Sequence, residues 1–75
     1  MTAKQIADKV NQTGYEYYGE RARGWDADGF GRIYFGSDYI TVESDGTMHN
    51  DKRGKARAKT IGQDAVDAVS QIMAA

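Results

Sequence analysis

The sequence predicts a small α+β domain in which a short antiparallel sheet is covered on one face by two helices. Two neighbouring segments, 30–36 and 39–44, alternate apolar and polar residues with the period of two that is typical of strands. Stripes of apolar residues at helical spacing lie near both ends of the chain. Because each helix has one apolar stripe to bury, we expect both helices on the same face of the sheet. The expected order is α-β-β-β(-β)-α, in a single domain spanning 1–75.

Length and composition narrow the class of protein. A chain of 75 residues is near the lower size limit for an independent hydrophobic core, and without cysteine no disulfide can supplement that core. The net charge of −1 is not that of a protein held to nucleic acid by bulk charge. The chain has neither an apolar run long enough to cross a bilayer nor a signal-peptide pattern. We therefore expect a soluble, cytoplasmic protein with no membrane partner.

The first helix is predicted from its two ends. Thr2 and Gln5 form a capping-box pattern, in which a hydroxyl N-cap is followed three residues later by an amide side chain. The helix should stop near Thr13, where Gly14 can adopt the left-handed conformation that follows many helices. The apolar face between these ends consists of Ala3, Ile6, Ala7 and Val10.

A tyrosine-rich segment, 15–23, is the candidate for the first strand. Its parity places Tyr15, Tyr17, Arg21 and Arg23 on one face and leaves Tyr18 and Ala22 for the core. A bulge at Gly19 would change this parity halfway along the segment. We expect Gly24 through Gly29 to form a turn before the second strand.

The two central strands have two different faces. The core face collects Ile33, Phe35, Ile40 and Val42, and the opposite face collects Phe30, Arg32, Tyr34, Tyr39 and Thr41. After them, the Asp45-Gly46 dipeptide favours a tight type I′ hairpin turn. A short last strand from 47 to about 50 should place Met48 on the core side.

The last third of the chain is predicted to be a basic connector followed by a second helix. Residues 51–58 form a connector that is interrupted by glycine, and Thr60 with Gln63 repeats the capping-box pattern. Asp64 would lie in the first turn, where the helix dipole favours an anion. The apolar stripe of this helix is Ile61, Ala65, Ala68, Val69, Ile72 and Met73.

Motifs for catalysis, metals and cofactors are missing from the sequence. His49 is the only histidine and has no nucleophile or ligand set around it, and no phosphate-binding or dinucleotide-binding glycine loop is present. Asp26 and Asp28 match the start of a calcium loop, but its later ligand positions fall on Phe30 and Ser37, so these aspartates are interpreted as turn residues. We expect a non-catalytic protein with no cofactor and no metal.

The residue types at the uncovered sheet face favour binding. Tyrosine, tryptophan and arginine are the types that carry most of the energy of protein interfaces. The candidate binding residues on this face are Tyr15, Tyr17, Trp25, Phe30, Arg32, Tyr34 and Tyr39. A second candidate group is the basic run of the connector, Lys52, Arg53, Lys55, Arg57 and Lys59.

Two local resemblances indicate an alternative, a small RNA- or single-stranded-DNA-binding protein. The segment 28–35 resembles the RNP1 motif of RNA-recognition and cold-shock domains, but Asp28 stands where that motif is basic and Arg32 where it is aromatic. The helix–strands–helix order, with basic residues 52–59 before the last helix, resembles the double-stranded-RNA-binding domain. This alternative would use the same sheet face together with the basic segment.

A third resemblance concerns small phage-encoded anti-CRISPR inhibitors, which are often single domains with a short sheet flanked by helices. The segment that carries it contains Trp25-Asp26, Gly29-Phe30, Arg32 and Phe35, which is similar to the central segment of an inhibitor of a type I surveillance complex. That inhibitor is acidic and mimics nucleic acid, whereas this chain is nearly neutral. The resemblance implies a protein or nucleoprotein partner in the host cytoplasm. The chain itself would be a monomer, or a homodimer formed through an exposed sheet edge.

Overall fold

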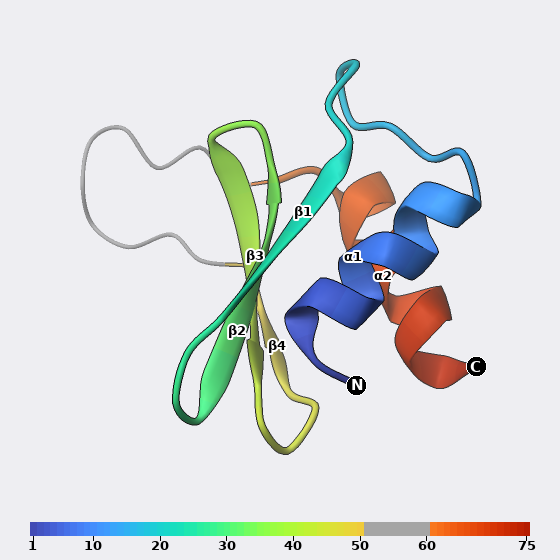
Figure 1. The fold of residues 1–75 in the computed structure, drawn as a ribbon. Coiled ribbons are helices and arrows are strands. Elements are labelled where there is room, and N and C mark those ends of the chain that lie inside the picture. The colour runs from blue at the N-terminus through green and yellow to red at the C-terminus, as the bar shows by residue number, and fades with distance from the viewer. Residues whose placement is uncertain (51–60) are drawn as a thin grey trace.

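The computed structural model describes residues 1–50 and 61–75, and contains two helices and four strands (Figure 1). The strands form one antiparallel sheet in the order β1-β2-β3-β4, with consecutive strands as neighbours. The predicted α+β class and order of elements are confirmed. The elements are α1 (Ala3–Gln12), β1 (Ala22–Asp26), β2 (Phe30–Phe35), β3 (Asp38–Glu43), β4 (Met48–His49) and α2 (Gln63–Ala74).

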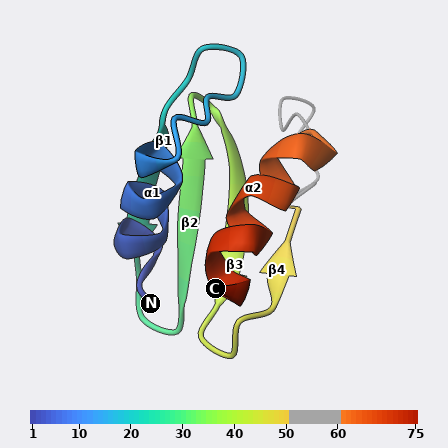
Figure 2. The ribbon, with the colours of Figure 1, turned by 90° about the vertical axis from the view of Figure 1, so that its right-hand side faces the viewer.

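Both helices lie on one face of the sheet, as the sequence predicts (Figure 2). Helix α1 packs chiefly on β1 and also contacts β2 and α2. Met48 is partly buried against the core, on the expected side. Neither described helix is long and apolar enough to span a bilayer. The core between helices and sheet consists of Ala3, Ile6, Ala7, Val10, Tyr17, Ala22, Ile33, Phe35, Ile40, Val42, Ile61, Ala65 and Val69.

The ends of α1 agree with the prediction. The Thr2 hydroxyl accepts a hydrogen bond from the Gln5 amide at 3.1 Å, and the Gln5 side chain accepts one from the Thr2 amide at 2.9 Å. Thr13 is the C-cap, and Gly14 follows with a φ of +84°. Local side-chain chemistry therefore sets both boundaries of this helix.

The start of α1 is fixed to the sheet. The Asp26 carboxylate, at the end of β1, accepts hydrogen bonds from the amides of Ala3 at 2.7 Å and Lys4 at 3.2 Å. It is thus an anion at a helix N-terminus, where the helix dipole favours it, and the expected role in a turn was wrong. The helix also lies close to two glycines, since a Cβ on Gly24 would overlap the Ala3 carbonyl and one on Gly31 would lie 2.7 Å from the Ala3 Cβ.

The first strand begins later in the sequence than predicted, at Ala22 instead of at residue 15. Instead of extending through 15–23, the chain makes a tight turn in which Tyr17 and Glu20 exchange two backbone hydrogen bonds of 2.9 Å. The two residues at its tip have positive φ, +50° for Tyr18 and +78° for Gly19, which is the type I′ pattern. The turn reverses the expected facing: Tyr17 is buried and Tyr18 is exposed, while Ala22 is buried as expected.

The loops between strands also correct two expectations. Gly24 belongs to β1, so the first turn is confined to 27–29 rather than beginning at Gly24. The Asp45-Gly46 turn is not type I′, because only Gly46 has a positive φ. The amide of Gly46 donates to the Glu43 carbonyl at 3.0 Å, and that of Glu43 to the Thr47 carbonyl at 2.8 Å. This pattern belongs to a three-residue loop with a glycine bulge.

Helix α2 begins later than predicted. Its N-cap is Gly62, without a side-chain cap, so the expected capping box was wrong; Thr60 and the connector 51–58 lie outside the described residues. The Gly62 amide donates instead to the Tyr17 hydroxyl at 2.9 Å, and the Asn50 side chain donates to the Ile61 carbonyl at 3.1 Å. Asp64 lies in the first turn as expected.

The free edge of β1 is occupied at one residue by a side chain of α1. The Asn11 amide donates to the Ala22 carbonyl and accepts from the Ala22 amide, both at 2.8 Å. These are the two bonds that a neighbouring strand would make. A second chain that paired with this edge would have to displace Asn11.

Candidate binding face on the outer side of the sheet

The face of the sheet away from the helices carries a continuous group of aromatic and arginine side chains. Strand register sets them in rows: Arg23 pairs with Tyr34 and Tyr34 with Tyr39, while Trp25 pairs with Arg32 in the next row. Side chains that share a face and are directly opposite lie close enough to interact. We call this group the outer cluster, and it consists of Arg23, Trp25, Phe30, Arg32, Tyr34 and Tyr39.

Arg32 is the centre of the outer cluster. Its guanidinium carbon lies 4.6 Å from the ring centroid of Tyr39, 5.7 Å from that of Phe30 and 5.8 Å from that of Trp25. Its Nη1 donates a hydrogen bond of 3.4 Å to the Tyr34 hydroxyl. A guanidinium over ring faces at these distances makes cation–π contacts. The rings therefore hold the cation in one place on the sheet.

A second arginine extends the group towards the β2–β3 turn. The Arg23 guanidinium lies 5.5 Å from the Tyr34 ring centroid and donates to the Gly36 carbonyl at 3.3 Å. The Tyr34 and Tyr39 rings are 5.2 Å apart, and the Trp25 and Phe30 rings meet edge to face at 5.7 Å. Each ring thus has an aromatic or cationic neighbour. These contacts within the protein hold the side chains in place, and preorganisation of this kind would lower the entropy lost if a partner bound.

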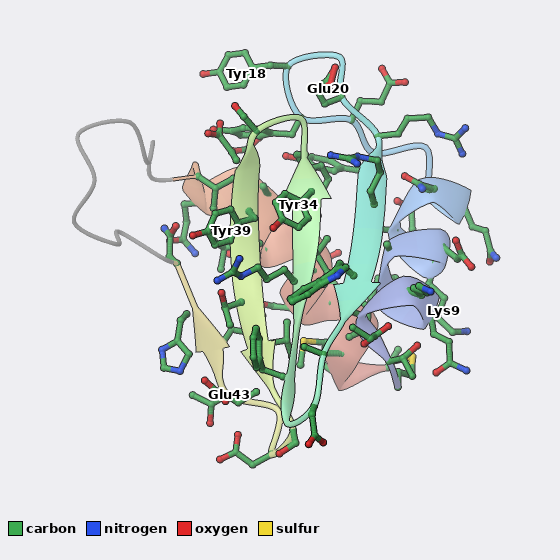
Figure 3. All side chains as sticks on the ribbon, turned by 60° about the vertical axis from the view of Figure 1, so that its left-hand side comes forward. Lys9, Tyr18, Glu20, Tyr34, Tyr39 and Glu43 are labelled. Carbon is green, nitrogen blue, oxygen red and sulfur yellow. The ribbon has the colours of Figure 1, made fainter. Side chains whose placement is uncertain are left out.

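No described element covers the outer cluster. Figure 3 shows Tyr34 and Tyr39 side by side on β2 and β3, on the opposite side of the sheet from α1. Trp25 is 45% exposed, and the rings of the other members are half-buried by one another. The face therefore combines large apolar contact area with one exposed cation, Arg23, and one half-buried cation, Arg32.

Charge is unevenly distributed over the outer face. The arginines lie towards the β2–β3 turn and the middle of the sheet, whereas Glu43 is at the opposite end, where His49 Nε2 lies 3.5 Å from its carboxylate. In the exposed β3–β4 loop, the Thr47 amide donates to the Asp45 carboxylate, and this lowers the pKa of Asp45. A partner with complementary charge would meet the arginine end with its own acidic groups.

The structure brings together five of the seven predicted face residues, Trp25, Phe30, Arg32, Tyr34 and Tyr39, but the placement of Tyr15 and Tyr17 was wrong. Tyr17 is 7% exposed and belongs to the core. Tyr15 packs edge to face on Phe35 at 5.8 Å, and its hydroxyl donates to the Asp64 carboxylate at 2.8 Å. The turn at 17–20 causes this, because it carries both rings to the helix side.

The predicted basic binding group of the connector lies outside the described residues; its members are Lys52, Arg53, Lys55, Arg57 and Lys59. Conversely, Arg23 belongs to the outer cluster although it was not among the predicted binding residues. A pattern in the sequence could have identified Arg23, since the small residues Ala22 and Gly24 alternate with Arg23 and Trp25. Small side chains on one face of a strand let a helix approach that face, so the larger side chains must lie on the other face.

Within residues 1–50 and 61–75, no three potential metal-ligating side chains are grouped closely enough to hold an ion. No protein-family model matches the chain, and no curated protein and no solved structure matches it. The outer face, with its ordered rows of rings and arginines, is thus the feature of the molecule that bears on function.

Proposed function

We propose that this protein is a non-catalytic binding module whose outer cluster docks on a protein or nucleoprotein partner. The observation that supports this most directly is the position of Arg32, held over three rings on a sheet face that no described element covers. Aromatic rings with an embedded arginine are the composition of interface hot spots. The partner surface offers carboxylates to the exposed Arg23 and apolar groups to the exposed Trp25.

A protein surface suits this face better than a bare nucleic-acid strand. Proteins that bind single strands present open ring faces on which bases stack. Here the ring faces of Tyr39 and Phe30 are turned towards the Arg32 guanidinium, and Tyr34 has Arg23 over it. Arg23 and Arg32 are the cations of the outer cluster, and Glu43 on the same face would repel phosphates.

The resemblance of the central segment to anti-CRISPR inhibitors gives the proposal a specific target class. Trp25, Phe30 and Arg32, which carry that resemblance, are three members of the outer cluster. The proposed target is a host defence protein or a nucleoprotein surveillance complex of the CRISPR type. Binding there would block the target sterically, without a chemical step.

The test is co-elution of the purified protein with a purified type I surveillance complex, and capture of partners from a host lysate. The test variant is Arg32→Glu/Tyr34→Ala, which reverses the central charge and removes a ring. The control is Lys9→Glu, a charge reversal on the exposed side of α1, far from Tyr34 and Tyr39 (Figure 3). We expect a complex with the wild type and the control, and its loss with the test variant.

Other results would revise the proposal at different levels. Equal recovery of every partner by wild type and test variant would exclude the outer cluster. Binding to a lysate protein but to no surveillance complex would keep the face and exclude the target class. Tight binding of free single strands with a steep salt dependence, lost on neutralising Lys52, Arg53 and Lys55, would replace the proposal with nucleic-acid binding.

A further inference from the structure

The tight turn between Tyr17 and Glu20 has an unexpected residue at its tip. Tyr18 has a φ of +50°, in the left-handed region that bulky L-residues rarely adopt and that type I′ turns usually fill with Asn, Asp or Gly. The side chain is also 89% exposed, so its ring contributes little to the core. Apart from one contact with the Tyr17 ring, the Tyr18 side chain has no packing that would require tyrosine at this position, and backbone conformations of this kind are concentrated at functional sites.

The ring of Tyr18 borders an open notch of about 780 Å³ at the end of the sheet. The Tyr17 and Tyr18 rings meet at 86° with centroids 4.7 Å apart, so the two rings make an aromatic corner. Figure 3 shows Tyr18 and Glu20 together at the end of the molecule opposite Glu43. The notch is lined by Tyr17, Tyr18, Glu20, Phe35, Gly36, Ser37 and Asp38.

Two carboxylates complete the notch. The Glu20 side chain contacts the β2–β3 turn, because a Cβ added to Gly36 would lie 3.0 Å from Oε2 of Glu20. Asp38 follows the same turn as the first residue of β3, and it also lines the notch. Within the described part of the chain, neither carboxylate has an ion pair or a side-chain hydrogen bond. The notch therefore has an exposed ring, a second ring at a right angle and negative charge.

We propose that this notch binds an alkylammonium group, the chemistry of a lysine side chain or of a small organic amine. The ammonium would lie over the Tyr18 ring by a cation–π contact, with Glu20 and Asp38 as counter-charges and the alkyl stem against the rings. Carboxylates alone would bind any cation; the aromatic corner adds a preference for alkylated ones. The site shares no residue with the outer cluster and does not depend on the function proposed for it.

The backbone of Tyr18 allows an unusually clean variant. Asn tolerates the left-handed region, so Tyr18→Asn deletes the ring while relaxing the turn, and we expect a melting temperature equal to or above that of the wild type. Tyr18→Phe is the matched control that keeps an aromatic face. Loss of binding by Tyr18→Asn cannot then be attributed to unfolding, which amide NMR spectra of each variant would verify.

The probes are a short capped peptide with one trimethyllysine, the same peptide with lysine, the same with neutral acetyl-lysine, and free tetramethylammonium, each titrated by amide NMR. We expect the ammonium probes to shift the amides of 17–20 and 36–38. Tyr18→Asn should weaken binding of the ammonium probes about fivefold or more, and Tyr18→Phe much less.

Tighter binding of the peptides than of tetramethylammonium would identify a protein side chain as the source of the ammonium group, and equal binding would identify a free amine. Absence of shifts, binding of acetyl-lysine as strong as that of lysine, or full binding by Tyr18→Asn would overturn the proposal.

Discussion

The two faces of the sheet are made by alternate residues of the same strands, yet they have opposite properties. On the inner face, Ile33, Phe35 and Ile40 are almost wholly removed from water under the helices. On the outer face, the neighbouring residues Arg32 and Tyr34 are half-buried, and the Arg32 guanidinium donates a hydrogen bond to the Tyr34 hydroxyl. The inner face contributes to the stability of the fold, and the outer face is left uncovered by any described element. In β2 and β3, successive residues thus alternate between the buried core and the outer cluster.

The largest contrast should appear when an aromatic ring is removed from each face of β2. Phe35→Ala should lower the free energy of unfolding by about 3–5 kcal/mol, because Phe35 is 1% exposed and a cavity would remain. Tyr34→Ala, its neighbour in sequence, should cost about 1 kcal/mol. Urea denaturation followed by circular dichroism measures both. Similar losses would mean that the outer cluster stabilises the fold as much as the core does.

The second effect concerns the contact that holds α1 on the inner face. Asp26→Asn removes the negative charge that accepts the amides of Ala3 and Lys4, and should lower the free energy of unfolding by about 1–2 kcal/mol. Asp28→Asn is the matched control in the following turn, because the Asp28 side chain has no described hydrogen-bond partner. This control should change the free energy of unfolding by less than about 0.5 kcal/mol. An equal effect of both variants would show that general charge, rather than the link to α1, is responsible.

A smaller effect on stability is expected at the centre of the outer face. Arg32→Met keeps an apolar stem but removes the cation, and should cost about 1 kcal/mol. Trp25 is the only tryptophan, so its fluorescence should change when the guanidinium 5.8 Å from its ring is lost. Arg21→Met, at an exposed position outside the cluster, should leave both the emission spectrum and the melting temperature unchanged. A spectrum unaffected by Arg32→Met would contradict the described geometry.

The sequence could predict β2, β3 and α1 because their signals are local and agree with one another. Ile33 and Phe35 alternate with polar neighbours, and Thr2 with Gln5 makes a cap whose two hydrogen bonds both form. Local agreement of this kind specifies an element before tertiary contacts form. The members of the outer cluster that lie on β2 and β3 follow directly from that alternation.

The first strand could not be predicted in the same way. A run of tyrosines favours a strand, but at Tyr18 and Gly19 the chain makes a turn with a residue type that such turns seldom contain. The small residues Ala22 and Gly24 alternate along β1, but this pattern is weak by itself, because its cause is the tertiary contact of Gly24 with α1. The start of α2 was missed for a related reason, since its first amide contacts involve Tyr17, far away in sequence, rather than a local cap.

The smallest expected effect lies on the inner side and appears only in alkali. Partial burial and the hydrogen bond to the Asp64 carboxylate raise the pKa of Tyr15 above its ordinary value of 10.0. Since the folded state holds this proton more tightly than the unfolded state, the stability contributed by the hydroxyl is complete below pH 10 and is lost as the pH rises beyond it. Tyr15→Phe lacks the hydroxyl, so the stability difference between wild type and this variant should be constant up to about pH 10 and then shrink. Effects of pH that the two proteins share cancel in this difference. A difference that stays constant to the highest pH at which both proteins remain folded would mean that the link from Tyr15 to α2 does not form.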